Sequence, residues 1–316
     1  MAMRTINKEE IIANLGHVIV LMGGDSTERE ISLLSGQAVY DSLQRLGINS
    51  SLIDVGDMIV ADLSQAKPDL VFNMLHGKGG EDGTIQGMLE IMKVSYTGSG
   101  VLSSSLAMDK VVSKLLWQKI GLGTADFVTL NAITDWQSVI EKLGKVVVKP
   151  VGGGSSLGIA IAKNASSLEQ NYKEAVKFDS GVMAEKYIEG KEYSVGILGD
   201  QLLPLIQLRT KREFFDYDAK YIDEDTEIIC PPMLSAQKKE ELQDLVRAAY
   251  ESLSCKGLAR VDVMQDEAGE FYLLEVNTVP GMTSHSFVPM SAQRIGIDFD
   301  ELLLRILEVE MEDNKK

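Results

Sequence analysis

The chain has 316 residues, 45% of them hydrophobic, and a formal net charge of -16. This length is enough for two or three compact units, and the apolar content excludes a disordered chain. The strong acidity argues against binding to nucleic acid or to an anionic membrane. Two cysteines, Cys230 and Cys255, are too few for a disulfide framework, and no export segment precedes the first predicted strand, so we expect a cytoplasmic protein.

The N-terminal third predicts strands and helices in alternation. Residues 18–22 form a short β-rich run that ends in two glycines, and further strands are predicted at residues 51–55 and 70–75. Thr27 and Glu30 stand at capping-box spacing, which predicts a helix that begins near Thr27. Strand, helix and strand at this spacing indicate a parallel sheet, whose ligands gather at the carboxyl ends of the strands.

The middle of the chain predicts a small antiparallel unit with helices packed on it. Residues 103–120 have helical spacing, and strands at residues 145–150 and 159–162 enclose a glycine loop. Two more strands are predicted at residues 181–187 and 192–198. The glycine loop can approach phosphate oxygens closely, but without a Gly-Lys-Ser/Thr ending it is not a Walker A loop. On its own it is equally consistent with a plain flexible turn.

The C-terminal part predicts a charged helix over residues 235–253, a hairpin over residues 257–277 and a closing helix over residues 299–311. If Ala268-Gly269 forms a two-residue turn, Asp262 stands opposite Glu275 and Arg260 opposite Asn277. Strand alternation also predicts one shared face for the return-strand residues Phe271, Leu273, Glu275 and Asn277.

The side chains of Asp262, Glu275 and Asn277 therefore converge on one patch. Oxygen ligands of this kind suit Mg²⁺, which usually also binds substrate phosphates. The alternative, a solvated strand face with cross-strand charge pairs, is the commoner outcome for an arbitrary hairpin. His76 follows a strand directly, and no second histidine stands at zinc-ligand spacing.

A series of segments, taken in chain order, resembles the D-alanine–D-alanine ligase family of the ATP-grasp superfamily. The resemblance extends along nearly the whole chain. The resemblance is carried by residues 23–36 (GGDSTEREISLLSG), 76–90 (HGKGGEDGTIQGMLE), 108–110 (MDK), 148–158 (VKPVGGGSSLG), 213–221 (EFFDYDAKY), 259–264 (ARVDVM) and 274–289 (LEVNTVPGMTSHSFVP). It implies an α/β (α+β) fold: an N-terminal parallel-sheet preATP-grasp domain and a two-part ATP-grasp fold. The implied units are a substrate-binding domain at residues 1–98, a central lid domain at 99–188 and a catalytic domain at 189–316.

The resemblance also assigns residues to substrates. ATP and two Mg²⁺ ions (or Mn²⁺) are the implied cofactors, with Asp262, Glu275 and Asn277 as the metal ligands. The implied nucleotide-binding residues are Lys110, Lys149, Ser156, Glu185, Lys186, Ile188, Glu192 and Lys220. Glu28 would pair with the ammonium of the first D-alanine beside Ser155 and Tyr221, with His76 near its carboxylate. Arg260 and the Gly281 N–H would stabilise the oxyanion, and Ser286 would hold the second D-alanine.

The implied reaction joins two D-alanines through a D-alanyl phosphate for peptidoglycan precursor synthesis, in a homodimer. The glycine loop and the segment around residues 214–221 would close over the reactive intermediate. Phe215 and Val279 depart from the commonest family residues, outside the groups that carry the chemistry. Tyr221 favours the dipeptide over a D-lactate ester. The rival interpretations are a ligase with a D-Ala-D-Ser or D-Ala-D-lactate product, a degenerate nucleotide-binding regulator and a dehydrogenase. The absence of a GxGxxG motif disfavours the dehydrogenase.

Overall fold

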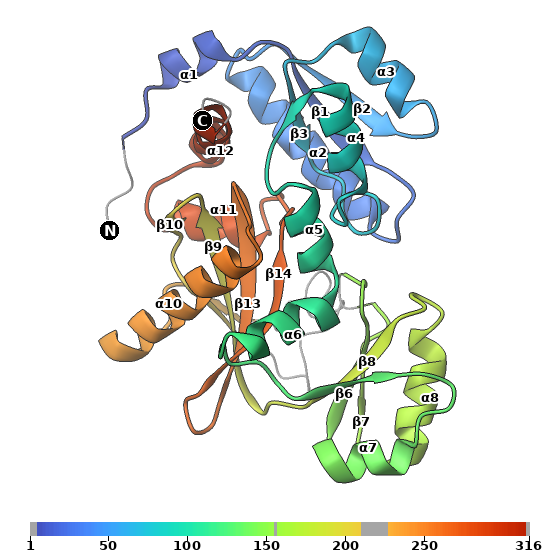
Figure 1. Cartoon of the computed structure of the whole chain (residues 1–316). Helices are drawn as coiled ribbons and strands as arrows, with labels where there is room; N and C mark the ends of the chain where they lie inside the picture. The colour runs from blue at the N-terminus through green and yellow to red at the C-terminus, as the bar shows by residue number, and fades with distance from the viewer. Residues whose placement is uncertain (1–4, 155–156, 210–226, 314–316) are drawn as a thin grey trace.

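A computed structural model describes residues 5–154, 157–209 and 227–313. The described chain builds three sheets, and Figure 1 shows the first at the top, the third in the middle and the second at the lower right. No helix within the described residues is long and apolar enough to cross a membrane.

The first sheet is parallel, as predicted, in the order β2-β1-β3-β4. Its strands are β1 (Val18–Gly23), β2 (Ser50–Val55), β3 (Leu70–Asn73) and β4 (Ser95–Tyr96), and its helices are α1 (Lys8–Asn14), α2 (Arg29–Arg45), α3 (Ile59–Ala66) and α4 (Thr84–Met92). The prediction of a capping box at Thr27 was wrong. Helix α2 begins at Arg29 after Glu28, whose side chain makes no capping hydrogen bond. Glu28 instead lies buried beside the glycine loop.

The second sheet is antiparallel, in the order β5-β8-β6-β7, and the predicted hairpin around the glycine loop is confirmed. It contains β5 (Phe127–Leu130), β6 (Val146–Pro150), β7 (Ala160–Ala162) and β8 (Val182–Lys186), covered by α7 (Trp136–Leu143) and α8 (Ala165–Ala175). The predicted strand at residues 192–198 does not belong to it. That strand, β9 (Gly190–Leu198), pairs with strands of the third sheet.

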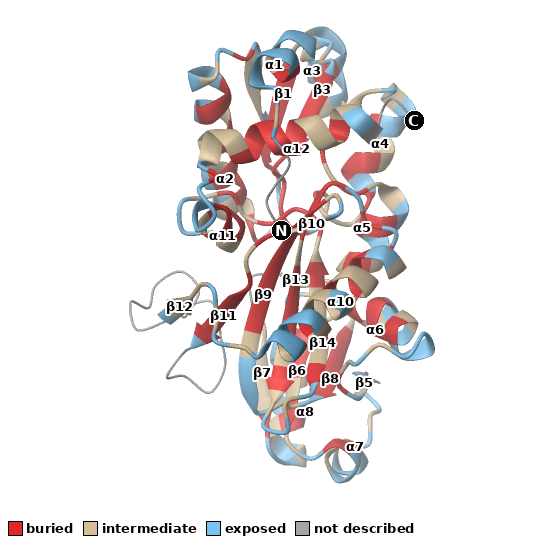
Figure 2. Ribbon diagram, turned by 90° about the vertical axis from the view of Figure 1, so that its left-hand side faces the viewer, coloured by how far each residue is buried: buried red, intermediate tan, exposed pale blue. Residues whose placement is uncertain are grey.

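The third sheet runs β12-β11-β9-β13-β14, with β10 paired to β9. Its other strands are β10 (Gln201–Leu202), β11 (Ile206–Arg209), β12 (Glu227–Ile229), β13 (Leu258–Asp266) and β14 (Phe271–Asn277), and the helices of this part are α10 (Ala236–Ser252), α11 (Phe287–Gln293) and α12 (Phe299–Asp313). The predicted C-terminal helices and hairpin are confirmed. Figure 2 shows that β9 and β13, the middle strands, are buried along most of their length.

The helical stretch predicted over residues 103–120 is two helices, α5 (Val101–Met108) and α6 (Lys110–Lys119). The break falls at Asp109, which has extended backbone angles and whose side chain accepts a hydrogen bond from the Val112 N–H at 2.9 Å. This is ordinary N-capping by an aspartate. Because of this cap, Lys110 is the first residue of α6, and the N-terminus of the helix lies beside the glycine loop.

The hairpin β13-β14 has the predicted pairing at the site but not the predicted turn. Asp262 pairs with Glu275 and Arg260 with Asn277, while Gly269 donates to the Asp266 carbonyl in a loop one residue longer than expected. A register shift between Asp262 and Val263 compensates by placing one extra residue on β14. Such a bulge reverses which face later side chains occupy.

The prediction that Phe271 and Leu273 share a face with Glu275 was therefore wrong. Both side chains pack in the core formed with α10 and α6. Beyond the bulge, only Glu275 and Asn277 remain on the polar face with Asp262.

The hydrophobic cores cross the proposed unit boundaries at residues 98/99 and 188/189. Helix α12 places five buried residues, Leu302, Leu303, Leu304, Ile306 and Leu307, in a core that also contains residues of β1, β3 and β13. Helix α6 contributes Trp117 to the core of the third sheet. The division into three units at these boundaries stays a prediction. The packing joins the first sheet to the third through a shared core.

Replacing Leu304 with alanine tests this tie. Leu304 is 0% exposed in the shared core, so Leu304→Ala should cost about 2–5 kcal/mol of unfolding free energy through lost burial and a cavity. Urea titration followed by circular dichroism measures the change. Ile133→Ala, at a residue that is 92% exposed, is the matched control and should change stability little. A Leu304→Ala protein as stable as the control would contradict the packing of α12.

Candidate active site

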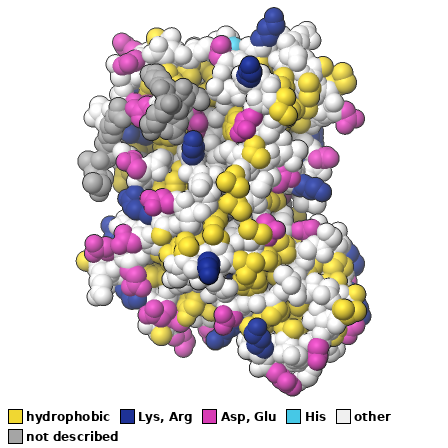
Figure 3. All heavy atoms as spheres, viewed as in Figure 1, with side chains coloured by type: hydrophobic (Ala, Val, Ile, Leu, Met, Phe, Trp, Pro, Cys, Tyr) yellow, Lys and Arg dark blue, Asp and Glu magenta, His cyan; other side chains and the backbone are white. Residues whose placement is uncertain are grey.

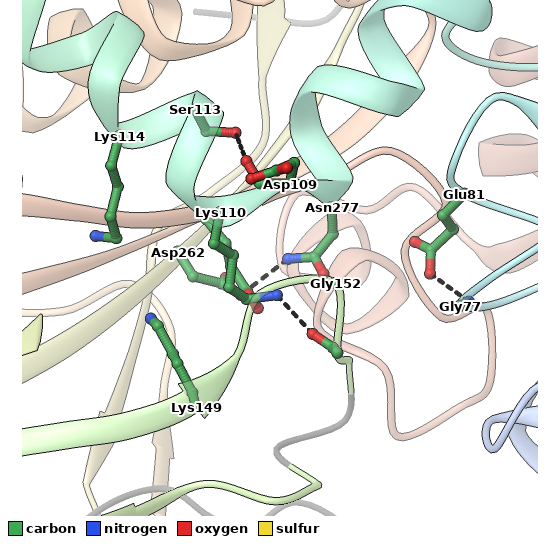
Figure 4. Close-up of polar contacts among 12 residues, drawn as sticks. Gly77, Glu81, Asp109, Lys110, Ser113, Lys114, Lys149, Gly152, Asp262 and Asn277 are labelled. Atoms are coloured by element: carbon green, nitrogen blue, oxygen red, sulfur yellow. Dashed lines mark hydrogen bonds and ion pairs between the residues drawn. The ribbon is translucent and has the colours of Figure 1, made fainter. Parts of the chain in front are cut away.

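A pocket lies between the second and third sheets, where the glycine loop of β6 meets the polar face of β14. It is lined by Lys110, Lys149, Pro150, Gly153, Gly154, Leu157, Ile159 and Glu275. The predicted lysines therefore come together with one predicted metal ligand, although they lie on three separate elements. Figure 4 shows Lys110, Lys149, Asp262 and Asn277 gathered around this point.

Lys110 is held at the mouth of the glycine loop. Its ammonium donates to the Gly153 carbonyl at 2.5 Å and lies 3.2 Å from a carboxylate oxygen of Glu275. The side chain is only 8% exposed, so its charge is poorly hydrated. A cation fixed this way is ready to accept a phosphate, since these contacts leave its position set before any ligand arrives.

Lys149, on β6, forms an ion pair with Glu185 of β8, and both side chains are nearly fully buried. A second lysine, Lys114 of α6, approaches the other oxygen of the same carboxylate at 2.9 Å. The pKa of Glu185 is lowered because the attraction of Lys114 and Lys149 outweighs the cost of burying the carboxylate. One carboxylate thus stands between two ammonium groups.

Glu185 was predicted to line an adenosine pocket together with Lys186, Ile188 and Glu192. These residues follow one another from the end of β8 into β9, the segment that joins the second sheet to the third. The carboxylate of Glu185 is directed at the two lysines, and Lys186 beside it is exposed. The adenosine contacts stay a prediction.

Asp262, Glu275 and Asn277 form a cluster of oxygen ligands on the paired strands. Asp262 is 5% exposed and accepts hydrogen bonds from Ser194 Oγ at 2.7 Å and Asn277 Nδ2 at 3.1 Å. Arg260 grips the same carboxylate through two nitrogens, Nε at 3.0 Å and Nη2 at 2.8 Å. Two carboxylates and an amide oxygen fit Mg²⁺ when phosphate oxygens complete the shell.

Among the described residues no group of three or more His, Cys, Asp or Glu side chains could hold a metal. The predicted ligand set has only two carboxylates, Asp262 and Glu275, beside the amide of Asn277. So small a set is typical of Mg²⁺ in nucleotide sites, where the ion keeps few protein ligands.

Glu28 approaches the glycine loop from the first sheet. A Cβ built on Gly154 would lie 2.2 Å from Glu28 Oε1, so only glycine allows the loop to come this close. Gly77, in the loop after β3, lies against the same carboxylate with a φ of +69°. The predicted phosphate-binding loop and the predicted D-alanine site therefore meet at Glu28.

His76 is buried and Glu81 is half-buried, and both lie against the loop after β14. Burial, reinforced by the charge of Arg260, lowers the pKa of His76 to about 4, so the imidazole is neutral near pH 7. Its Nε2 atom has no hydrogen-bond partner among the described residues. Burial and the nearby Glu28 carboxylate raise the pKa of Glu81 to about 8. The Gly77 N–H donates to Glu81 at 2.7 Å, as Figure 4 shows.

The loop after β14 carries the last predicted residues, Gly281 and Ser286. A Cβ on Gly281 would lie 2.9 Å from Ser286 Oγ, which accepts from the Thr283 N–H at 3.0 Å. The Met282 N–H donates to Ser35 Oγ of α2 at 3.2 Å, which fixes this loop to the first sheet. The predicted residues Ser155, Ser156, Lys220 and Tyr221, and with them Phe215, lie outside the described residues.

Comparison with known proteins places this arrangement in a family. The family models described as D-ala D-ala ligase N-terminus and C-terminus match residues 57–99 and 116–308. Proteins named D-alanine–D-alanine ligase from Saccharophagus degradans and Chromohalobacter salexigens are each 47% identical over 93% of this chain and 94% of their own. The chain belongs to the D-alanine–D-alanine ligase family.

A solved structure confirms that the likeness extends to the fold. The D-alanine–D-alanine ligase from Bacillus anthracis complexed with ATP superposes with a TM-score of 0.83 at 34% identity, over 95% of this chain and 98% of that one. The predicted fold class, with a parallel N-terminal sheet followed by antiparallel sheets, is confirmed.

Sequence reasoning missed Glu81 and Lys114. Glu81 lies inside the quoted motif of residues 76–90, five positions after His76, and nothing in the spacing shows that it lies near Glu28. Lys114 stands four residues after Lys110, so the two share one face of a helix. The four-residue spacing could have indicated that Lys114 lies near the predicted phosphate site. That inference also required knowing which face of the helix packs against β8.

The raised pKa of Glu81 predicts a pH-dependent contribution to stability. Its ordinary pKa is 4.5, whereas the folded protein holds the proton up to about pH 8. Between these values the folded state binds more protons, so stability falls as pH rises. Glu81→Gln removes this titration. From pH 5 to pH 8 the wild type should lose stability relative to Glu81→Gln, by at most about 1.4 kcal/mol per pH unit.

Urea titrations at several pH values measure this difference. Groups that do not interact with Glu81 titrate alike in both proteins and cancel in the comparison, whereas the nearby Glu28 carboxylate contributes to the difference together with Glu81. Parallel stability curves for the two proteins would show that Glu81 titrates in the folded state as it does in the unfolded chain.

Proposed function

We propose that this chain catalyses the ATP-dependent ligation of two D-alanines to D-alanyl-D-alanine through a D-alanyl phosphate, with the described site as its active centre. As in its family, ATP and Mg²⁺ are the cofactors. One observation supports the site above all: a phosphate-ready pocket with Lys110 and Lys149 adjoins both the Asp262–Glu275 pair and the buried Glu28 carboxylate.

Two lysines serve the nucleotide. Lys110 and Lys149 bind the phosphates of ATP, with the backbone N–H groups of the glycine loop approaching between them. Lys220 is proposed to reach the transferred phosphate, and Ser156 to belong to the closing loop. Residues Glu185, Lys186, Ile188 and Glu192 are proposed to surround the adenosine.

Asp262, Glu275 and Asn277 are proposed to hold Mg²⁺, which when bound neutralises the charge of the phosphates. The chain prepares for it by keeping both carboxylates beside cations, Asp262 against Arg260 and Glu275 against Lys110. These contacts hold the two carboxylates in place. Since Lys110 also meets the phosphates, the nucleotide and the metal share one electrostatic environment.

The first D-alanine is proposed to lie between Glu28 and His76. The Glu28 carboxylate pairs with its ammonium, and Ser155 and Tyr221 are proposed to hydrogen-bond with Glu28. A neutral His76 with an open Nε2 can donate to the D-alanine carboxylate without a net charge of its own. A protonated histidine would hold the carboxylate more tightly and make it a poorer nucleophile toward ATP.

Phosphorylation turns an oxide leaving group into a phosphate. The free amine of the second D-alanine, held at its carboxylate by Ser286, then attacks the acyl carbon. Negative charge develops on the carbonyl oxygen, where Arg260 and the Gly281 N–H are proposed to donate. Arg260 is already fixed by its bidentate pair with Asp262, so little reorganisation is needed as the charge develops.

Two features of context complete the proposal. Synthesis of a peptidoglycan precursor from ATP and D-alanine places the enzyme in the cytoplasm, which agrees with two free cysteines, Cys230 and Cys255, in the described chain. A homodimer is proposed across α5 and α6, where Figure 3 shows hydrophobic side chains gathered on the surface. Leu102 on α5 and Leu115 on α6 are 63% and 54% exposed there.

The activity is tested by phosphate release from Mg²⁺-ATP with the product identified by mass. D-alanine should stimulate release and yield D-alanyl-D-alanine, whereas L-alanine should do neither, as expected for a member of the D-alanine–D-alanine ligase family. A D-Ala-D-Ser or D-Ala-D-lactate product at equal substrate concentrations would favour the related ligase. Absence of release with any acid would favour the regulator.

Arg260→Met should lower kcat by about 10²–10³-fold, the usual effect of removing an oxyanion donor. The KM for ATP should rise by a smaller factor than kcat falls, because Arg260 is proposed to affect the nucleotide only through Asp262. Steady-state kinetics with saturating D-alanine measure both values. Arg45→Met removes an exposed arginine paired with Asp300 and is the control. A kcat within threefold of the control would remove Arg260 from the chemistry.

A second copy of the chain on α5 and α6 predicts a particle of twice the chain mass. Leu115→Glu places a charge in the centre of that face and should shift sedimentation toward the monomer. Ile133→Glu, on the exposed loop before α7, leaves the proposed face intact and should remain dimeric. A wild type that sediments as a monomer, or a Leu115→Glu dimer of unchanged stability, would refute this interface.

A further inference from the structure

Lys114 is a charged side chain in a place where charge is costly. It is 0% exposed in the middle of α6, with its ammonium enclosed by three groups. The ammonium donates to Thr124 Oγ1 at 2.7 Å and to the Leu273 carbonyl at 3.0 Å, and it pairs with Glu185 at 2.9 Å. Two hydrogen bonds and one ion pair thus surround the ammonium, so it is not a stray surface lysine that has folded inward.

The partners of Lys114 belong to both sheets that border the pocket. Glu185 lies on β8 of the second sheet and Leu273 on β14 of the third, two residues before Glu275. Thr124 completes the link, since its hydroxyl also donates to the Leu273 carbonyl and its backbone forms an isolated bridge with that residue. Lys114 therefore ties the two walls of the pocket together from behind.

Packing alone does not account for a lysine here. An ion pair buried this deeply is often no more stable than a well-packed apolar replacement, because both charges lose their hydration. The mechanism proposed above gives Lys114 no contact with any substrate. The remaining consequence of its charge is the effect on Glu185, and through it on Lys149.

The charges of this trio add up in a simple way. Lys114 and Lys149 contribute two positive charges and Glu185 one negative charge, which leaves a net charge of one positive unit. Burial lowers the pKa of Lys114 to about 8, so the ammonium is mostly protonated at pH 7. Without Lys114, Glu185 would cancel the charge of Lys149, and the attraction of the glycine-loop end of the pocket for phosphate would be weakened to that of Lys110 and the backbone N–H groups.

We propose that Lys114 is a positioning residue for ATP: it balances Glu185, so that Lys149 keeps both its place and its effective positive charge for the nucleotide phosphates. The inference rests on the proposed ATP site. In this arrangement Glu185 holds Lys149 still without neutralising it, because a second lysine shares the carboxylate. The phosphate-binding cation is thus set by a residue that never touches the phosphate.

The test compares Lys114→Met with Lys119→Met. Methionine matches the lysine in length without its charge, and Lys119 is an exposed lysine at the end of the same helix. Calorimetry at pH 7 gives the affinity for a non-hydrolysable Mg²⁺-ATP analogue and, by competition, for adenosine. Lys114→Met should weaken the analogue about tenfold or more and adenosine by at most about threefold, since the phosphates sense the lost charge directly and adenosine only through its proposed contact with Glu185. Lys119→Met should bind both as the wild type does.

The double variant Lys114→Met/Glu185→Gln separates charge from packing. It restores the net positive charge of the trio, so affinity for the analogue should recover by at least half of the loss on a logarithmic scale. Thr124→Val, which removes one neutral partner of Lys114, should weaken the analogue in the same direction by a smaller factor. Thermal melts establish that each variant is folded, and Thr124→Val carries the test if the charge variants do not fold.

Three results would overturn the inference: analogue binding by Lys114→Met within twofold of the control, equal weakening of analogue and adenosine, or a double variant no better than the single one. If Lys114→Met does not fold, unchanged binding by Thr124→Val has the same meaning. A wild type that binds neither ligand would instead refute the ATP site itself, so the two failures are distinguishable.

Discussion

The arrangement of the site depends on keeping lysines and carboxylates close together without letting them cancel. Phosphate binding needs positive charge, metal binding needs ionised carboxylates, and both are required within one pocket. Three carboxylates of the site are each paired with a cation from another element or from another position on the same strand. Glu275 pairs with Lys110, Asp262 with Arg260, and Glu185 with two lysines. Burial strengthens each of these attractions and fixes their geometry.

This electrostatic constraint explains why the site stands where three sheets meet. No single sheet could present so many like charges on one face without repulsion. Lys149 comes from the second sheet, Glu275 from the third and Glu28 from the helix that follows the first strand, and Gly154 allows the last of these to touch the glycine loop. The hydrophobic core shared under α12 fixes the first sheet relative to the third. Substrate-binding residues from both sheets can therefore lie close to the same nucleotide.

The sequence predicted the chemistry of the hairpin better than its geometry. Alternation placed Asp262 opposite Glu275 correctly, because the longer loop and the bulge compensate each other before the strands reach the site. The same reasoning placed Leu273 on the polar face, since a bulge leaves no reliable mark in a run of apolar residues. Local patterns fix pairing near a turn, and packing decides what happens beyond it.

The residues that sequence reasoning missed share a cause. Lys114 and Glu81 are polar side chains whose surroundings are completed by distant segments. Glu185 and Leu273 contact Lys114, and Glu28 and Val279 lie near Glu81, so no short window of the chain reveals either environment. The break at Asp109 was similar in kind: its capping role is local, but apolar spacing continued across it and hid the change. The resemblance to a family supplied roles for motif residues, whereas the buried supports behind them required the fold.

The most direct test of the account follows the oxygen atoms of the first D-alanine. When D-alanine labelled with ¹⁸O in its carboxylate is ligated, activation by phosphorylation makes that oxygen the bridge to phosphorus, and amine attack releases it with the phosphate. Mass spectrometry should therefore find one ¹⁸O atom in each inorganic phosphate formed alongside D-alanyl-D-alanine. Product formed with unlabelled phosphate would contradict an acyl-phosphate intermediate, and with it the purpose assigned to the whole arrangement of lysines and carboxylates.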